Sequence, residues 1–171
     1  ETHAYLHLPG CLSDGQTSRL QSWVDDLYRW PETPFKWMKY FENGQNSARQ
    51  LCRIEHFLDY HNGLKELVSG QATLHMLSQL MGEPATLFKE KINFKLPGGA
   101  GFSAHQDAPA FSYFGPEYHI TMMISVDHSN ENNGGLEFSP RLDVGHVLPQ
   151  SSDGSIEPSV AATLDWFPLP T

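Results

Sequence analysis

The spacing of hydrophobic residues changes from a helical to a strand-like period near Pro84. Before it, apolar positions recur every three or four residues over residues 13–30 and 64–81, which predicts helices. Gly70 interrupts the second stretch, so two shorter helices are an alternative there. Beyond Pro84, apolar and polar residues alternate, and turns rich in Gly, Pro and Asn separate the alternating stretches, which is typical of β-strands.

These elements predict one domain of mainly β structure with N-terminal helices. Strands are expected at residues 4–8, 86–96, 119–126 and 136–138. Ser13, with Gln16 three residues later, is typical of a capping box at the start of the first helix. The chain of 171 residues has no internal repeat or linker, so we expect a single domain over residues 1–171. Residues 1–84 would form an N-terminal strand and helical layer, and residues 85–171 a β-barrel core.

The composition argues against several classes of function. The chain has 11 Lys and Arg against 20 Asp and Glu, a net charge of −9, which disfavours binding to nucleic acid or to an anionic membrane surface. No apolar run is long enough to span a bilayer, and the first residues lack a signal-peptide pattern. Cys11 and Cys52 lack C-x-x-C spacing, so we expect reduced thiols in a cytoplasmic protein.

His105 and Asp107 are the leading candidates for chemistry. They stand one residue apart after a strand-like run, and alternate residues of an extended strand project to the same side, so both side chains can hold one ion. A histidine and a carboxylate are two of the three ligands in the facial triad that binds non-haem Fe(II). An H-x-D motif is weak evidence by itself, so its interpretation depends on the surrounding pattern.

Lysines gather on one face of the predicted strand 86–96. One face carries Lys89, Lys91, Asn93 and Lys95, and the other carries Phe88, Glu90, Ile92, Phe94 and Leu96. One interpretation is a solvated face. The other is a polar barrel interior, in which a lysine holds a carboxylate or phosphate as a point charge. The alternation leaves both interpretations open.

Four features of the second half occur in a fixed order. They are Ile92-Asn93-Phe94-Lys95 with its Pro-Gly turn, His105-Gln106-Asp107, the strand-like run from His119 to His128, and Asn132-Asn133-Gly134-Gly135-Leu136 followed by Ser139-Pro140. Together they resemble the phytanoyl-CoA dioxygenase family of Fe(II)- and 2-oxoglutarate-dependent oxygenases. The resemblance implies a double-stranded β-helix, a jelly-roll or cupin-like barrel.

The resemblance also implies roles for individual residues. His105 and Asp107 would be catalytic and bind the iron. The co-substrate 2-oxoglutarate would lie against Lys91, Gln106, Thr121 and Met123, which places the lysine face toward the barrel interior. Asn93, Lys95, Phe102, Phe111 and Tyr113 would contact the substrate. The implied reaction consumes O2 and 2-oxoglutarate and hydroxylates, or otherwise oxidises, a C–H bond of a small metabolite, with an anionic one favoured by the lysines.

One part of the family pattern is absent from this chain. The family's second histidine ligand and the arginine that binds 2-oxoglutarate lie on later strands, and neither is found before Thr171. We therefore expect the C-terminal strands of the barrel to be missing from the chain. His146 stands in a loop where the family often has a histidine that is not a ligand, so we do not assign it to the metal. The alternative function is a catalytically incompetent or ligand-binding member of the same fold.

Overall fold

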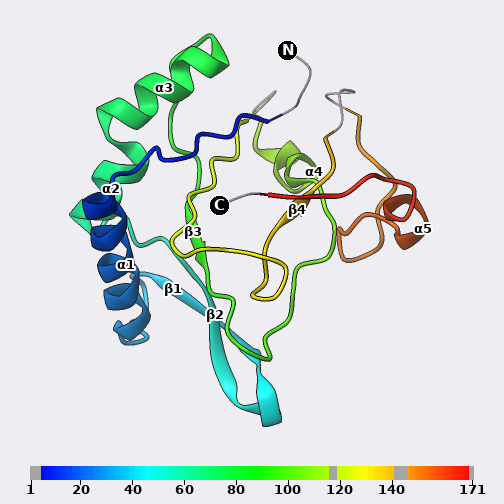
Figure 1. Ribbon diagram of the computed structural model, residues 1–171, viewed down its shortest axis with the longest axis horizontal. Helices are drawn as coiled ribbons and strands as arrows, with labels where there is room; N and C mark the ends of the chain where they lie inside the picture. The colour runs from blue at the N-terminus through cyan, green and yellow to red at the C-terminus, as the bar shows by residue number, and fades with distance from the viewer. Residues whose placement is uncertain (1–4, 116–118, 141–145, 170–171) are drawn as a thin grey trace. The chain divides into compact units, whose positions relative to one another are not determined.

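The computed structural model describes residues 5–115, 119–140 and 146–169, and its chain divides into two compact units (Figure 1). The helix–sheet unit comprises Leu12–Ala100. The motif unit comprises Glu1–Cys11 and Gly101–Thr171 and contains the H-x-D motif. Residues 85–100 belong with the helices, because the strand that they contain pairs with a strand of the helix–sheet unit. That the whole chain acts as one domain stays a prediction.

The first predicted helix is confirmed, together with its capping box. Helix α1 spans Asp14–Arg29, and Ser13 and Gln16 form the reciprocal cap, in which the Ser13 amide donates to Gln16 Oε1 at 2.9 Å. The apolar stripe turns inward at Leu20, Val24 and Leu27, all of which are buried. These three side chains supply the helical part of the core of the helix–sheet unit.

Lys39 satisfies the other end of α1. Its ammonium donates to the carbonyl oxygens of Tyr28 at 2.9 Å and Trp30 at 2.7 Å, which are groups that a helix C-terminus leaves without intrahelical partners. The negative end of the helix dipole also favours a cation here. Burial lowers the pKa of Lys39 below its ordinary value, since desolvation opposes the charged form.

The second helical stretch is two helices, as the position of Gly70 allowed. Helix α2 spans Asn62–Ser69, α3 spans Gln71–Met81, and Gly70 ends one and begins the other with an extended backbone. Helix α3 ends at Gly82, whose φ of 75° is in the left-handed region that favours glycine. Helix α2 packs on α1 where Gly63 meets the indole of Trp23.

The main sheet belongs to the helix–sheet unit. Strands β1 (Met38–Asn43), β2 (Arg49–Glu55) and β3 (Lys91–Asn93) run antiparallel in the order β1-β2-β3. The 3-10 helix η1 (Gln45–Ser47) connects the first two, and the register shifts between Tyr40 and Phe41. Ile54 lies in the centre of the sheet and is completely buried.

The motif unit contains short elements. They are α4 (Asp107–Phe111), the 3-10 helix η2 (Ser112–Phe114), α5 (Pro158–Ala161), and strands β4 (Glu137–Phe138) and β5 (Phe167–Pro168), which pair antiparallel. The strand predicted at 136–138 is thus confirmed within one residue. Those predicted at 4–8 and 119–126 are wrong for the described residues, which form no regular strand there. Residue 4 lies outside the described part.

A closed barrel is not confirmed. Across the described ranges, the strands form one three-stranded and one two-stranded antiparallel sheet, and neither closes on itself. The predicted combination of antiparallel strands with N-terminal helices is present. Among the residues that the structure describes, no helix is both long enough and apolar enough to cross a membrane.

Candidate metal centre

His105 and Asp107 point to the same place, as their spacing predicts. Gln106, between them, has the extended backbone angles φ −107° and ψ 134°, so the two neighbouring side chains project to one side. The distance between His105 Nε2 and Asp107 Oδ1 is 3.5 Å, and the side chains are 45% and 31% exposed. An imidazole nitrogen and a carboxylate oxygen thus meet at a place open to solvent.

A backbone carbonyl fixes which nitrogen of His105 faces Asp107. His105 Nδ1 lies 2.8 Å from the carbonyl oxygen of Ser103. A carbonyl only accepts, so Nδ1 carries the proton and donates it, and the neutral ring keeps its lone pair on Nε2. Histidine ligands of metals are commonly oriented by such a hydrogen bond from the other ring nitrogen. No sequence pattern predicts this contact, because a backbone carbonyl has no residue signature.

Thr121 orients the carboxylate of Asp107. Its hydroxyl donates to Asp107 Oδ2 at 2.8 Å, while Oδ1 faces His105. Thr121 was expected to reach 2-oxoglutarate; the structure shows its hydroxyl bound to the Asp107 carboxylate, and its contact with 2-oxoglutarate stays a prediction. Met123, two residues later, is about half exposed, and its predicted contact with 2-oxoglutarate stays a prediction.

Gln106 binds the backbone of a later segment. Its Nε2 donates to the carbonyl oxygen of His146 at 3.0 Å, and its Oε1 accepts from the amide of Leu148 at 2.8 Å. Both ends of the side-chain amide are therefore engaged within the motif unit. The expectation that Gln106 also lies beside 2-oxoglutarate stays a prediction.

The donor set fits Fe(II) in part. Imidazole nitrogen and carboxylate oxygen are the ligand types of the facial triad, and no thiolate lies with them to favour a closed zinc site. In the described part of the chain, no third His, Cys, Asp or Glu joins a cluster that could hold a metal. His146 is described, and it contributes its carbonyl oxygen to Gln106. The pair would accordingly supply two of the three protein ligands of a facial triad.

The residues of the helix–sheet unit that were predicted to bind the co-substrate or the substrate are all exposed. Lys91, Asn93 and Lys95 are exposed, while the alternate positions Ile92 and Phe94 are partly buried, so the predicted alternation is present. Whether the lysine face lines a barrel interior stays a prediction.

The same face carries a charge network that was not foreseen from the sequence. Arg53 donates to Asn93 Oδ1 at 3.0 Å and lies 3.4 Å from Glu55, which also pairs with Lys89 at 3.2 Å and accepts from Tyr40. Glu55 is only 5% exposed, and a carboxylate buried to this degree needs such partners. The register of β1, β2 and β3 brings these residues together, and the sequence alone does not show that register.

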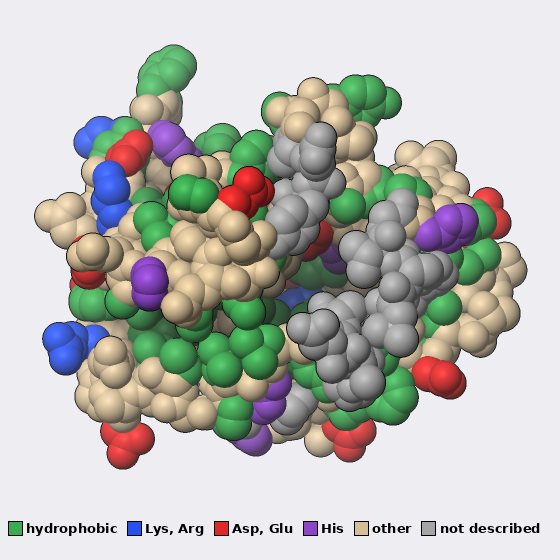
Figure 2. Space-filling view, turned by 90° about the horizontal axis from the view of Figure 1, so that it is seen from above, with side chains coloured by type: hydrophobic (Ala, Val, Ile, Leu, Met, Phe, Trp, Pro, Cys, Tyr) green, Lys and Arg blue, Asp and Glu red, His purple; other side chains and the backbone are tan. Residues whose placement is uncertain are grey.

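The aromatic candidates of the motif unit differ in their surroundings. Phe111 is partly buried and packs edge-on against His119, with ring centroids 5.5 Å apart. Phe102 is half exposed, and Tyr113 is 96% exposed. Figure 2 shows hydrophobic side chains at the surface of one face of the molecule, with acidic ones scattered among them. Their predicted contact with substrate stays a prediction.

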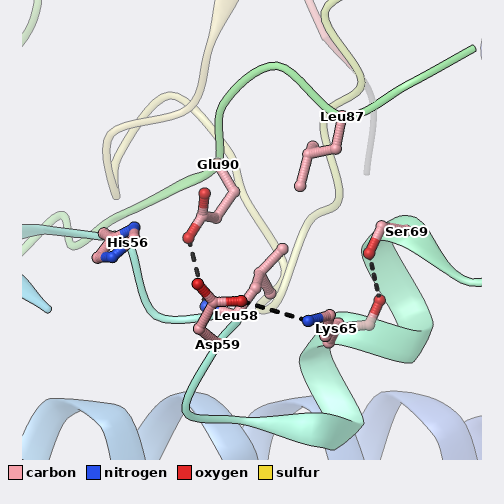
Figure 3. A pocket seen from close by; sticks show the side chains of 7 residues that line it. All are labelled: His56, Leu58, Asp59, Lys65, Ser69, Leu87 and Glu90. Atoms are coloured by element: carbon pink, nitrogen blue, oxygen red, sulfur yellow. Dashed lines mark hydrogen bonds and ion pairs between the residues drawn. The ribbon is translucent and has the colours of Figure 1, made fainter. Parts of the chain in front are cut away.

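A separate pocket lies within the helix–sheet unit. Its lining residues are His56, Leu58, Asp59, Lys65, Ser69, Leu87 and Glu90 (Figure 3). Glu90 Oε1 accepts from the amides of Phe57 at 2.8 Å and Leu58 at 3.3 Å, and Lys65 pairs with Asp59 at 3.2 Å. Ser69 Oγ donates to the carbonyl of Lys65 at 2.9 Å, and no residue predicted for the metal or substrate lines the pocket.

Comparison with known proteins decides the family. The phytanoyl-CoA dioxygenase (PhyH) family model matches residues 1–141, which include the whole H-x-D motif and the Thr121 that binds it. The chain belongs to the phytanoyl-CoA dioxygenase family. The PhyH family implies a cupin-like fold, in keeping with the antiparallel strands. No solved structure matches the chain significantly.

Three relatives with curated names are oxygenases of small phosphorus compounds. The chain is 51% identical over 170 residues to a 2-aminoethylphosphonate dioxygenase of uncultured bacterium HF130_AEPn_1, covering 99% of the chain and 65% of that protein. It is 42% identical to a methylphosphonate hydroxylase of Gimesia maris, covering 97% and 63%. It is 30% identical over 106 residues to a "probable alpha-ketoglutarate-dependent hypophosphite dioxygenase" of Stutzerimonas stutzeri, covering 62% and 36%. The chain thus spans just under two thirds of the first two relatives.

Proposed function

We propose that this chain forms the metal-binding part of an Fe(II)- and 2-oxoglutarate-dependent dioxygenase that oxidises a C–H bond of a small organophosphonate. The observation that carries the proposal is the pair His105 Nε2 and Asp107 Oδ1, 3.5 Å apart and open to solvent. Family membership supports the oxygenase class. The names of the two most similar relatives given above support a phosphonate, and the third supports 2-oxoglutarate as co-substrate.

Residues of the chain would prepare the metal site in two ways. The Ser103 carbonyl keeps the proton on His105 Nδ1, so Nε2 is available as a ligand. The Thr121 hydroxyl holds one oxygen of Asp107, so the other is free to bind the metal. Bound Fe(II) would supply O2 activation coupled to conversion of 2-oxoglutarate into succinate and CO2. In that chemistry one oxygen atom of O2 would end in succinate and the other in the oxidised product.

The exposed lysines would contribute charge. Lys91 is assigned to 2-oxoglutarate by the family resemblance, and Lys95 with Asn93 to an anionic substrate. A phosphonate carries negative charge at neutral pH, and a lysine binds such a group as a point charge. Dependence of succinate formation on a phosphonate substrate tests this recognition.

The test measures succinate formation by the full-length protein with Fe(II), O2 and 2-oxoglutarate. We expect succinate production to depend on 2-aminoethylphosphonate or methylphosphonate and to disappear in His105→Ala and Asp107→Ala, each of which removes one metal ligand. His75→Ala and Asp165→Ala are matched controls, because both residues are exposed and lie outside the motif. Undiminished turnover in either ligand variant would refute the assignment. A wild-type protein that binds phosphonate without forming succinate would support the ligand-binding alternative.

A further inference from the structure

We propose that Gln106 is a positioning residue, whose side-chain amide ties residues 146–148 to the H-x-D motif and thereby fixes the direction of His105 and Asp107. The inference deepens the proposed function and rests on it, because it concerns His105 and Asp107, the two residues that would bind the metal. It rests on two hydrogen bonds, from Gln106 Nε2 to the His146 carbonyl at 3.0 Å and from the Leu148 amide to Gln106 Oε1 at 2.8 Å.

The bonded segment is one arm of a hairpin that also binds the other side of His105. The amide of Ile156 donates to the carbonyl of Ala104 at 2.7 Å, and Gln150 pairs with Ile156 as an antiparallel bridge. Residue 104 is thus bonded to one arm of the hairpin, and Gln106 is bonded to the other. His105 lies between the two connections, so its backbone has little freedom to turn the imidazole away from Asp107.

The hairpin is itself firmly placed. Leu148 and Ile156, one on each arm, are 7% and 5% exposed, and they are the buried hydrophobic residues among those described in the motif unit. The amide of Glu157 donates to the carbonyl of Pro149 at 3.0 Å and closes the hairpin. The hydrogen bonds of Gln106 therefore connect the exposed His105 and Asp107 to Leu148 and Ile156, the only apolar core in the described part of this unit.

The chemistry at position 106 requires a primary amide of this length. One end must donate to a carbonyl and the other must accept from an amide, and the side-chain amide of Gln offers an NH2 donor and an oxygen acceptor side by side in one plane. In Gln106→Glu, a carboxylate oxygen would face the His146 carbonyl with no proton between them. Gln106→Leu removes both bonds and leaves the partly buried Leu148 amide without its acceptor. Gln106→Asn keeps the amide but shortens its reach by one methylene.

The experiment compares these variants in the full-length protein with Co(II) alone as the probe. Hydrogen exchange at the Leu148 amide reports whether its hydrogen bond to Gln106 is intact. Titration with Co(II) reports the affinity of His105 and Asp107 for a metal ion. We expect faster Leu148 exchange in Gln106→Glu and Gln106→Leu, and a Co(II) Kd raised by about 10- to 100-fold, the usual range for partners that orient metal ligands. The visible absorption bands of bound Co(II) should also shift, because the ligand geometry changes. The control variants Gln79→Glu and Gln79→Leu change an exposed position of α3. They should alter neither the Leu148 exchange rate, nor the Co(II) Kd, nor the absorption bands.

Each result separates the inference from the proposed function. Faster exchange at Leu148 with unchanged Co(II) affinity and spectrum would show a purely structural tie and overturn the inference. A raised KM for 2-oxoglutarate with unaltered Co(II) binding would overturn it in favour of direct co-substrate contact. If Gln106→Glu and Gln106→Leu do not fold, Gln106→Asn decides by the same three measurements. Failure of the wild-type protein to bind Co(II) would instead refute the proposed metal centre, while exchange at Leu148 would still report the tie.

Discussion

The contacts of single side chains in this protein range from exposed ion pairs to the oriented side chains of His105 and Asp107. Arg49 makes a bidentate pair with Glu32, with distances of 2.7 and 2.8 Å, while its guanidinium stacks 3.3 Å from the ring centroid of Phe41. Planar geometry lets arginine use its edge and its face at once. The hydrogen bond from Arg49 is the main cause that lowers the pKa of Glu32 below 4.5.

The Glu32–Arg49 pair should give a pH-dependent contribution to stability. Because the pKa of Glu32 is lower when folded than when unfolded, the contribution is fully present above pH 4.5 and is lost as pH falls through the lowered folded value. Glu32→Gln should reduce the free energy of unfolding slightly near neutral pH and not at all well below 4.5, measured by urea unfolding at low salt. Glu83→Gln, at an exposed turn, is the control. A difference that persists in acid would contradict the assignment.

Residue-scale features were predictable where they depend on neighbours in the sequence. The capping box of Ser13 and the shared direction of His105 and Asp107 follow from spacings of three and two residues. The partners of Gln106 and Thr121 stand 40 and 14 residues away, at His146 and Asp107, and no local pattern encodes them.

At the scale of elements, two glycines at the second position of a helix have opposite surroundings. A Cβ on Gly63 of α2 would lie 2.6 Å from Trp23 Cζ2, whereas one on Gly15 of α1 would meet nothing within 4 Å. Trp23 is partly buried and packs edge-on against His61, with centroids 5.5 Å apart, so it is not free to move away. The glycine at 63 therefore sets how closely α2 approaches α1.

This contrast predicts opposite effects of the same substitution. Gly15→Ala should stabilise the protein by up to about 1 kcal/mol, because alanine favours a helix over glycine. Gly63→Ala gains the same propensity but must displace the indole, and overpacking of this kind costs about 1 to 3 kcal/mol, so a net loss is expected. Urea unfolding curves of the two variants and the wild type measure both. Equal stabilisation by the two substitutions would mean that α2 does not pack closely on Trp23.

Element types were predicted best where amphipathic periodicity was long. Helices α1, α2 and α3 follow from it, and the break at Gly70 was foreseen. The run 119–126 alternates but forms no strand, because alternation records which side faces water, whereas a strand also requires a hydrogen-bonding neighbour. Of the predicted strand 86–96, residues 91–93 form β3 beside β2, and the Phe94 amide adds one hydrogen bond to the Cys52 carbonyl of β2.

The whole molecule distributes its core unevenly. Of the buried hydrophobic residues among those described, eight lie in Leu12–Ala100 and two, Leu148 and Ile156, lie in the motif unit. The eight are Leu20, Val24, Leu27, Leu51, Ile54, Phe57, Leu58 and Leu64. Regions with few buried apolar contacts open at lower free energy. We therefore expect the stability of the motif unit to depend more on bound ligands.

Metal binding should protect the motif unit selectively. A ligand that binds only the folded state at 100 times its Kd stabilises it by about 2.7 kcal/mol. Adding Mn(II) should slow amide exchange around residues 104–107 and 148–156, leave β2 around Ile54 nearly unchanged, and be reversed by EDTA. Hydrogen exchange with mass spectrometry measures this. His105→Ala should show no metal effect, and equal protection of both units would contradict the expectation.

Strand β3 is synthesised well after its partner β2, and this order affects folding on the ribosome. Strands β1 and β2 are joined by a short turn, but about 35 residues, including α2 and α3, separate β2 from β3. At synthesis rates of about 5 to 20 residues per second, one edge of β2 stays unpaired for about 2 to 7 seconds on the ribosome. An open edge invites pairing with other nascent chains, and charged side chains discourage it. Strand β2 carries three charged side chains, Arg49, Arg53 and Glu55, which would oppose such pairing of the nascent chain during that interval.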